Sequence, residues 1–223
     1  MNLRKLLNSF KDETYISIAE IQRRMGVGYL TAGKYLVELI DKKYIYKNEE
    51  GKYVFNRKTV DTGINIIFLD IDGVLNCSTT KDKCGGYTGI EDQKVRLLKQ
   101  LVDKTNAKIV LVSTWKFYWY KEKYLKDKQD ELANYLDMKL VKQGLAIYDK
   151  TDDYEILERG GGILQYLNIL NIKGIKVNKY VILDDQLFDY LATRLTKHLV
   201  QTSYRDGGLQ EKHINKALEK MAD

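Results

Sequence analysis

Acidic and hydroxyl side chains stand at the ends of three short apolar runs in this sequence. The runs are IIFL at 66–69, IVLV at 109–112 and VIL at 181–183. The polar residues that close them are Asp70, Asp72, Ser113, Thr114, Asp184 and Asp185. An acid at the end of a buried strand is costly unless a partner neutralises it. The spacing therefore implies that a positive charge binds where these runs end.

A hard cation is the partner that this acidic set favours. Four carboxylates in one crevice would repel each other strongly in a low dielectric. Mg2+ fits best, because it takes oxygen ligands and is bound by a few carboxylates together with a substrate phosphate. Gly73 follows the second acid directly. A glycine there lets the chain turn sharply where a side chain would crowd an incoming group.

The elements that must position these residues alternate between strand and helix. A helix is expected from about 91 to 104, between the first two apolar runs. Short apolar runs separated by helices indicate a parallel sheet covered by helices on both faces, and ligands bind outside the carboxyl ends of its strands. The fold class is therefore α/β for a predicted second domain, 59–223. The polar stretch 56–65 is the expected boundary.

Residues 1–58 form a predicted smaller domain with a different pattern. Helices are expected over 17–26 and 29–42, separated by a short glycine turn and each carrying an apolar stripe. Alternating segments at 44–47 and 52–55 flank the loop Asn-Glu-Glu-Gly and predict a hairpin. Helix, tight turn, helix and hairpin in this order make a winged helix-turn-helix.

The segment SIAEIQRRMGVGYLTAGKYLVELIDKKYI resembles the gamma domain of the DNA translocase FtsK, a winged helix that reads duplex DNA. In such folds the second helix enters the major groove and the side chains near its start reach the bases. The expected base contacts are Tyr29, Thr31, Ala32 and Lys34. The expected phosphate contacts are Arg23, Arg24, Lys42, Lys43 and Lys52. If the domain binds a nucleic acid, DNA is preferred to RNA as its partner. The alternative is that these residues form a solvated face of a protein–protein adaptor.

The motifs DIDGVLN, VLVST and VILDD, in this order, resemble those of the haloacid dehalogenase (HAD) superfamily of phosphatases and phosphotransferases. The resemblance implies a Rossmann-like parallel sheet. It makes Asp70 the nucleophile that becomes an aspartyl phosphate, and Asp72 the general acid and then base. It also implies Mg2+ held by Asp184 and Asp185, together with Asp70 and the backbone carbonyl of Asp72.

The same resemblance implies groups that bind the phosphoryl oxygens. Ser113 would donate a hydrogen bond to them, with Thr114 as the alternate. The third motif of the superfamily is a Lys or Arg that neutralises the phosphoryl group and the nucleophile. Arg159 is the preferred candidate, because Gly160 to Gly162 behind it allow close backbone approach. Lys116, just after the second motif, is the other candidate.

The C-terminal stretch VQTSYRDGGLQEKHINKALEKM resembles the ending of HAD domains associated with nucleic-acid repair proteins. The sequence Ser113-Thr114-Trp115-Lys116 agrees with that resemblance. In those relatives the domain is taken to remove phosphate from polynucleotide ends. Gln186 departs from the pattern, because a basic residue often follows the acidic pair in end-processing phosphatases.

Two inserts surround the predicted crevice. NCSTTKDKCGGYTG, after the first motif, is expected to be a mobile flap rather than a capping domain, which leaves the site open to a macromolecular substrate. KFYWYKEKYLKDKQDELANYLDMKL, after the second motif, is expected to be one long helix. Most of its apolar residues, Trp119 and Leu132 among them, are expected to pack on the sheet. Tyr118 or Tyr120 is the candidate for stacking on a base.

Composition sets broader limits. The chain has 223 residues and a net charge of +6, which favours polyanionic partners only weakly. No stretch approaches the roughly 20 apolar residues of a membrane span, and the N-terminus lacks the pattern of a secretory signal, so a cytoplasmic location is expected. Cys77 and Cys84 are expected to be reduced thiols, and two histidines leave little for a zinc site.

Three functions remain open at this stage. The first is a Mg2+-dependent phosphatase that acts on nucleic-acid ends or nucleotides and is brought there by the winged helix. The second is a phosphatase of small metabolites whose N-terminal domain serves dimerisation or regulation. The third is a DNA-binding regulator whose HAD domain binds a phosphorylated ligand without turnover. The intact set of acids disfavours this third function.

Overall fold

The computed structural model describes residues 3–10, 13–55, 63–117, 119–152 and 159–222. The chain divides into two compact units. The first unit comprises Met1–Gly63 and Asn168–Lys176, and the second comprises Ile64–Leu167 and Val177–Asp223. The domain boundary expected between 58 and 59 falls outside the described residues.

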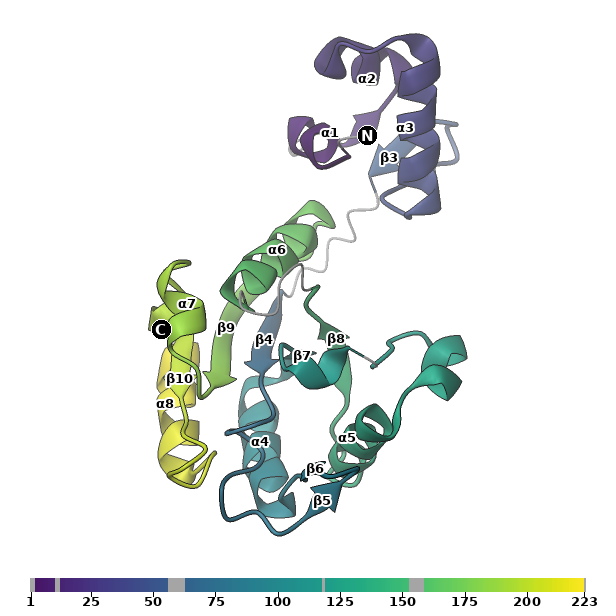
Figure 1. Cartoon of the computed structure of the whole chain (residues 1–223). Helices are drawn as coiled ribbons and strands as arrows, with labels where there is room; N and C mark the ends of the chain where they lie inside the picture. The colour runs from purple at the N-terminus through teal and green to yellow at the C-terminus, as the bar shows by residue number, and fades with distance from the viewer. Residues whose placement is uncertain (1–2, 11–12, 56–62, 118, 153–158, 223) are drawn as a thin grey trace. The chain divides into compact units, whose positions relative to one another are not determined.

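The first unit combines helices with a small antiparallel sheet. Its elements are α1 (Leu3–Ser9), β1 (Tyr15–Ile16), α2 (Ile18–Met25), α3 (Tyr29–Asp41), β2 (Ile45–Lys47) and β3 (Tyr53–Phe55) (Figure 1). The strands pair in the order β1-β3-β2. Helix α2 begins where the Ser17 hydroxyl accepts the Glu20 N–H at 3.2 Å, and it ends at Gly26, whose φ of 63° is left-handed.

The predicted order of helix, turn, helix and hairpin therefore occurs over residues 17–55. Helix α1 and strand β1 were not predicted, and β1 adds a third strand to the hairpin. Ile21, Leu39 and Ile45 form part of the core of this unit. The assignment of the unit to the nucleic-acid-binding winged helices stays a prediction.

The second unit is built on a five-stranded sheet whose strands all run parallel. The strands are β4 (Ile64–Leu69), β7 (Ala107–Leu111), β8 (Ile147–Lys150), β9 (Val177–Asp184) and β10 (Leu199–Gln201), in the order β10-β9-β4-β7-β8. The central strand β4 therefore lies between β9 and β7. The three apolar runs of the sequence are neighbours, as the alternation of strands and helices predicts.

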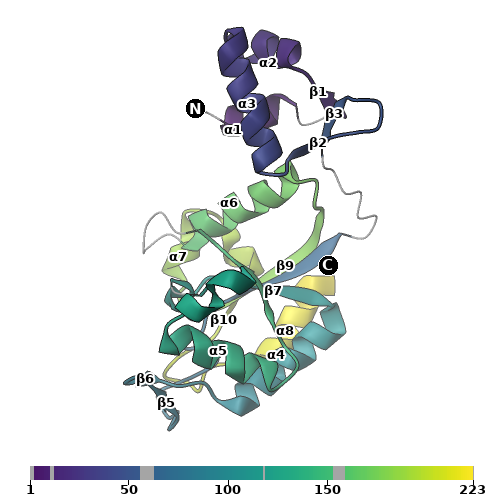
Figure 2. The ribbon, with the colours of Figure 1, turned by 90° about the vertical axis from the view of Figure 1, so that its right-hand side faces the viewer.

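Helices cover both faces of this sheet, which confirms the α/β class and the Rossmann-like architecture. The helices are α4 (Asp92–Thr105), α5 (Glu131–Val141), α6 (Arg159–Ile172), α7 (Phe188–Leu191) and α8 (Glu211–Ala222). Helices α4, α5 and α8 supply one face of the core, and α4 and α8 lie side by side (Figures 1 and 2). On the opposite face Tyr166 of α6 makes an edge contact with Phe68 of β4 at 6.0 Å between ring centroids.

The insert after the second motif is not one long helix. It contains the 3-10 turns η1 (Thr114–Lys116) and η2 (Lys123–Lys128) before α5, and a further turn, η3 (Leu195–His198), precedes β10. Helix α5 starts anew at Asp130, whose carboxylate accepts the Ala133 N–H at 2.8 Å. This cap satisfies a helix N-terminus and so breaks the predicted continuous helix. Trp119 is buried and Leu132 packs against the core, as expected, while Tyr118 lies outside the described residues.

The segment expected to be a flap contains a short hairpin, β5 (Lys83–Cys84) and β6 (Tyr87–Thr88). Gly85 and Gly86 form its turn, both with left-handed backbone. Cys77 and Cys84 are both buried, with free thiols in the structure. Among the described residues, no helix has the length and apolar character needed to cross a membrane.

Candidate active site

Strand register brings the three motifs together. Leu69 at the end of β4 pairs with Leu183 of β9 and with Leu111 of β7. The next residue, Asp70, donates its backbone N–H to the Leu183 carbonyl at 3.0 Å, and the Val112 N–H donates to the Leu69 carbonyl at 2.9 Å. Asp70 therefore follows the central strand at the edge where Asp184 and Ser113 also emerge. Parallel strands end together, so the sequence order of the motifs becomes proximity in space.

Asp70 is a buried carboxyl group with one free acceptor. Its residue is 1% exposed, and its Oδ1 has no hydrogen-bond partner among the described residues. Burial raises the pKa of Asp70 well above its usual value, and the charge of Asp184 raises it further. Arg159 and Ser113 act in the opposite direction. A buried oxygen without a partner is unusual in a folded protein and indicates a position for a ligand or ion.

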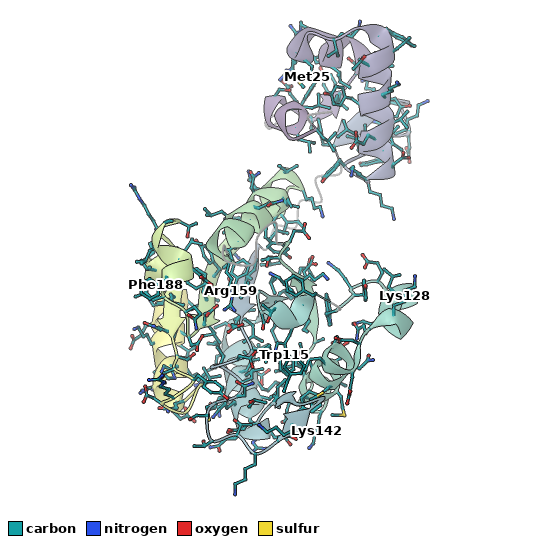
Figure 3. All side chains as sticks on the ribbon, in the orientation of Figure 1. Met25, Trp115, Lys128, Lys142, Arg159 and Phe188 are labelled. Carbon is teal, nitrogen blue, oxygen red and sulfur yellow. The ribbon has the colours of Figure 1, made fainter. Side chains whose placement is uncertain are left out.

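Arg159, the first residue of α6, forms ion pairs with these acids. Its Nη1 lies 2.6 Å from Asp184 Oδ2 and 3.2 Å from Asp70 Oδ2, and its Nε lies 3.5 Å from Asp189 Oδ2. Gly160 lets the helix approach closely, because a Cβ there would lie 2.6 Å from the Asp189 carbonyl oxygen. Figure 3 labels Arg159 and Trp115 within the second unit.

The acidic pair after β9 is held by its own neighbours. Tyr190, fully buried, donates its hydroxyl to Asp184 Oδ2 at 2.5 Å, and the burial of this phenol together with the Asp184 charge raises the Tyr190 pKa. Gln186 donates its backbone N–H to Asp184 Oδ1 and its side-chain amide to Asp185 Oδ1, each at 2.8 Å. Burial also raises the pKa of Asp185. Gln186, which departs from the expected basic residue, thus orients both acids.

Asp70, Asp184 and Asp185 have the geometry of a divalent-cation site. Each offers a carboxylate oxygen, and these oxygens all lie within 4.8 Å of one another. Gly73, with a φ of 77°, allows this, because a Cβ at that position would lie 2.6 Å from Asp185 Cγ. The side chain that a residue larger than glycine would crowd is therefore Asp185 itself. Oxygen ligands around an unpaired buried carboxylate oxygen fit Mg2+.

The comparisons with known proteins agree with this geometry. The family described as "HAD domain in Swiss Army Knife RNA repair proteins" matches residues 66–214, which is more than half of the chain. The chain belongs to this family. Neither the curated proteins nor the solved structures include a match to the chain. HAD membership and the acidic cluster together support a phosphatase-type hydrolase.

Asp72, the second acid of the HAD domain's first motif, is placed apart from the metal-binding group. Its carboxylate is not among the clustered ligand atoms, so its predicted metal contact rests on its backbone carbonyl. The Trp115 indole N–H donates to Asp72 Oδ2 at 2.9 Å, and the Asn76 amide donates to Asp72 Oδ1 at 2.7 Å. The residue is exposed to solvent, so the carboxyl group can meet a substrate.

The residues after the second motif of the HAD domain have different surroundings. Ser113 is fully buried, and a hydrogen bond from its hydroxyl lowers the pKa of Asp70. Thr114 is exposed. Lys116 is also buried, and its Nζ donates to the Thr151 hydroxyl at 2.7 Å and to the Val112 carbonyl at 3.3 Å. The contacts to the Asp70 and Asp184 carboxylates described above belong to Arg159, which favours it over Lys116 as the third-motif cation.

In the first unit, the residues predicted to contact bases differ in their exposure to solvent. Tyr29, Thr31 and Lys34 at the start of α3 are exposed, whereas Ala32 is fully buried, so the prediction that Ala32 reaches a base is wrong. Helical geometry turns this position toward the core, next to the exposed Thr31.

Several of the predicted phosphate contacts of the first unit form ion pairs with acidic side chains. Arg23 pairs with Glu20, Arg24 pairs with Glu13 and Glu20 and lies over the Phe10 ring, Lys42 pairs with Glu38, and Lys52 pairs with Glu50. Lys43 follows the C-cap of α3, Lys42, and has a left-handed φ of 57°. Surface pairs of this kind are weak and can exchange for phosphate, so these positions stay predictions.

Four side chains at the site were not predicted to have roles there: Asn76, Trp115, Tyr190 and Gln186. Asn76 and Trp115 lie inside quoted motifs, but nothing in their types or spacing indicates that both hydrogen-bond the Asp72 carboxylate. Tyr190 lies six residues beyond Asp184 on α7, and only the turn after β9 brings it back. A signal for Tyr190 would have required knowing that turn.

Proposed function

We propose that the protein is a Mg2+-dependent phosphomonoesterase that forms an aspartyl phosphate on Asp70 and releases phosphate from the end of a polynucleotide. The observation that carries the proposal is the state of Asp70. Its Oδ1 is buried and has no partner among the described residues, and its Oδ2 contacts a cation, Arg159. An oriented carboxylate with one unpaired oxygen beside a guanidinium is suited to attack a phosphoryl group.

The first half of the proposed reaction uses Asp70 and Asp72. A carboxylate oxygen of Asp70 forms a bond to phosphorus while the bond between phosphorus and the leaving oxygen breaks. The leaving oxygen takes its proton from the carboxyl group of Asp72. Arg159 and the Ser113 hydroxyl hold the phosphoryl oxygens, because both already act on the Asp70 carboxylate.

The second half restores the enzyme. Water attacks phosphorus, the bond to Asp70 breaks and its electron pair returns to the carboxylate, and Asp72 accepts the proton of the water. Asp70, Asp184, Asp185 and the Asp72 carbonyl would hold Mg2+. When bound, the ion neutralises the crowded acids and the phosphoryl charge.

A polynucleotide end is the proposed substrate class. The family description names RNA repair proteins, which favours RNA. The start of α3 in the first unit favours DNA, through its resemblance to a DNA-reading helix and the exposed Tyr29 and Lys34. We take RNA ends as the first substrate and the first unit, as a winged helix, as the element that binds the nucleic acid.

One feature of the first unit favours a second candidate. Leu30 and Val37 on α3 are 81% and 55% exposed, and Ile40 continues the same face at helical spacing. An exposed apolar stripe is typical of a protein contact. The alternative is therefore a metabolite phosphatase whose first unit serves dimerisation or regulation.

The test is release of inorganic phosphate from matched substrates. RNA and DNA oligonucleotides with a 3' or a 5' phosphate and a mononucleotide would be compared, with Mg2+ and with EDTA, using the native protein and Asp70→Asn. Metal-dependent release from an oligonucleotide, absent from Asp70→Asn, is the expected result. Release from the mononucleotide alone would favour the metabolite phosphatase. Binding of nucleic acid without any release would leave a regulator that does not turn over its ligand.

A further inference from the structure

The general acid of the proposed reaction is held from two sides. Trp115 donates its indole N–H to Asp72 Oδ2 at 2.9 Å and Asn76 donates its amide to Asp72 Oδ1 at 2.7 Å. Both donors are at least nine-tenths buried, while Asp72 itself is exposed. Each donor thus comes from the protein interior and fixes one oxygen of the carboxyl group of an exposed residue.

The two hydrogen bonds leave room for a proton. A carboxyl group offers about four lone-pair positions, two on each oxygen. Two N–H donors occupy one position on each oxygen, so the catalytic proton can take one of the others. The arrangement fixes the plane of the carboxyl group without blocking its chemistry.

Asn76 also ties this acid to two parts of the backbone. Its Oδ1 accepts the Gly73 N–H at 2.9 Å, and its Nδ2 donates to the Thr88 carbonyl of β6 at 3.2 Å as well as to Asp72. Both N–H groups of the amide therefore have acceptors, and the side chain joins the loop of the first motif to the hairpin β5–β6. Trp115 is equally constrained, since it packs in the core of the second unit.

We infer that Trp115 and Asn76 are positioning residues that fix the Asp72 carboxyl group toward the leaving oxygen. The inference rests on the proposed function. Neither residue touches the substrate. Each acts through Asp72, on the step in which the proton moves to the leaving oxygen as its bond to phosphorus breaks.

The leaving group separates positioning from a structural role. An alkoxide that leaves from a ribose needs a proton, so its departure depends on Asp72. The p-nitrophenolate anion is stable at neutral pH, so its departure depends on Asp72 far less. A variant that only loosens the fold should slow both substrates equally.

The chain offers a matched control. Trp119 is also buried in the core, and its indole N–H donates at 2.9 Å to another carboxylate, Asp137. Trp115→Phe and Trp119→Phe therefore make the same chemical change and remove the same kind of hydrogen bond. Only the first change reaches Asp72.

The experiment measures kcat/KM for the phosphorylated oligonucleotide and for p-nitrophenyl phosphate, with Mg2+ present, because kcat/KM reports formation of the aspartyl phosphate and not its hydrolysis, in which Asp72 serves both substrates as the base. Trp115→Phe should lower kcat/KM for the oligonucleotide by about tenfold and change kcat/KM for p-nitrophenyl phosphate by less than about twofold. Trp119→Phe should leave the ratio of the two rates unchanged. Asn76→Leu, which removes the amide donor without adding a charge, should lower the rate for the oligonucleotide relative to that for p-nitrophenyl phosphate, in the same direction as Trp115→Phe.

A double-mutant cycle completes the test. In Asp72→Ala, adding Trp115→Phe should cause no further loss on the oligonucleotide, because there is no carboxyl group left to position. Equal losses on both substrates, or full additivity with Asp72→Ala, would overturn the inference and leave phosphate release intact. Failure of the native protein to release phosphate from either substrate would instead overturn the proposed function, and this inference with it.

Discussion

Replacement of Arg159 by methionine tests how the buried acids are balanced. The guanidinium contacts Asp184 and Asp70, which are 0% and 1% exposed. Removing one partner of a buried ion pair costs about 3 to 5 kcal/mol. We expect the lower figure, about 3 kcal/mol at neutral pH without metal, because one carboxyl group can take up a proton instead. For a unit of this size that loss lowers the melting temperature by about 6 to 12 °C.

The loss should depend on pH in a defined direction. Burial and the Asp184 charge raise the pKa of Asp70 well above its usual value. A carboxyl group whose pKa rises on folding costs stability as the pH increases from its unfolded pKa to its folded pKa. Without the Arg159 charge the folded pKa rises further, so the destabilisation should grow over a pH range that rises through the folded pKa of Asp70.

Tryptophan fluorescence makes this measurement specific to the second unit. The chain has two tryptophans, Trp115 and Trp119, and both lie in that unit. Melting curves with EDTA would be recorded for the native protein, Arg159→Met and Arg96→Met, an exposed arginine of α4 that serves as the control. Addition of Mg2+ should restore part of the loss. A destabilisation below about 1 kcal/mol, or one that is equal at both ends of the pH range, would refute the reasoning.

Three further outcomes are expected. Gly73→Ala should raise the Mg2+ concentration that gives half-maximal phosphate release by about tenfold or more. The left-handed backbone at this position costs an alanine about 1 to 2 kcal/mol, and its Cβ would press on Asp185. An unchanged Mg2+ titration would contradict this. Hydrogen bonds from Lys139, and to a smaller extent from Lys142, lower the pKa of Asp92 to about 2. These hydrogen bonds therefore stabilise the fold above about pH 4, and the stabilisation is lost as the pH falls toward 2. Lys139→Met should therefore lose about 1 kcal/mol at neutral pH, discounted for exposure, and much less near pH 2 in an acid titration of fluorescence. Asp184→Asn should abolish the rise in melting temperature that Mg2+ gives the native protein, and a preserved rise would place the ion elsewhere.

The strands and helix that position the site could be predicted because they depend on local pattern, whereas α1, β1 and β8 were not predicted. The apolar runs at 66–69, 109–112 and 181–183 became neighbouring parallel strands, and the helix expected at 91–104 occurs as α4. Periodicity and the turn residues specify such elements without knowledge of the tertiary structure. The prediction of one long helix over the insert was wrong. The composition of the insert favours a helix throughout, but the cap at Asp130 starts a new helix within it.

The site residues that the sheet made predictable are those at the ends of its parallel strands. Strand-end residues meet at one edge, so Asp70, Ser113 and Asp184 were predictable from the sheet. Trp115, Asn76 and Tyr190 were not, since their roles depend on where a side chain points after an irregular turn.

Detection of phosphate on Asp70 tests the central claim most directly. The native protein and the variant Asp72→Asn, which lacks the base for hydrolysis of the adduct, would be mixed with Mg2+ and p-nitrophenyl phosphate, whose leaving group needs no proton from Asp72. The mixtures would be quenched in acid and digested, and the peptide containing Asp70 weighed by mass spectrometry. The mass of one added phosphoryl group on Asp70, present with Mg2+, stronger in Asp72→Asn and absent with EDTA, is the expected result. Phosphate release without that adduct, or continued release by Asp70→Asn, would contradict the assignment of Asp70 as the nucleophile.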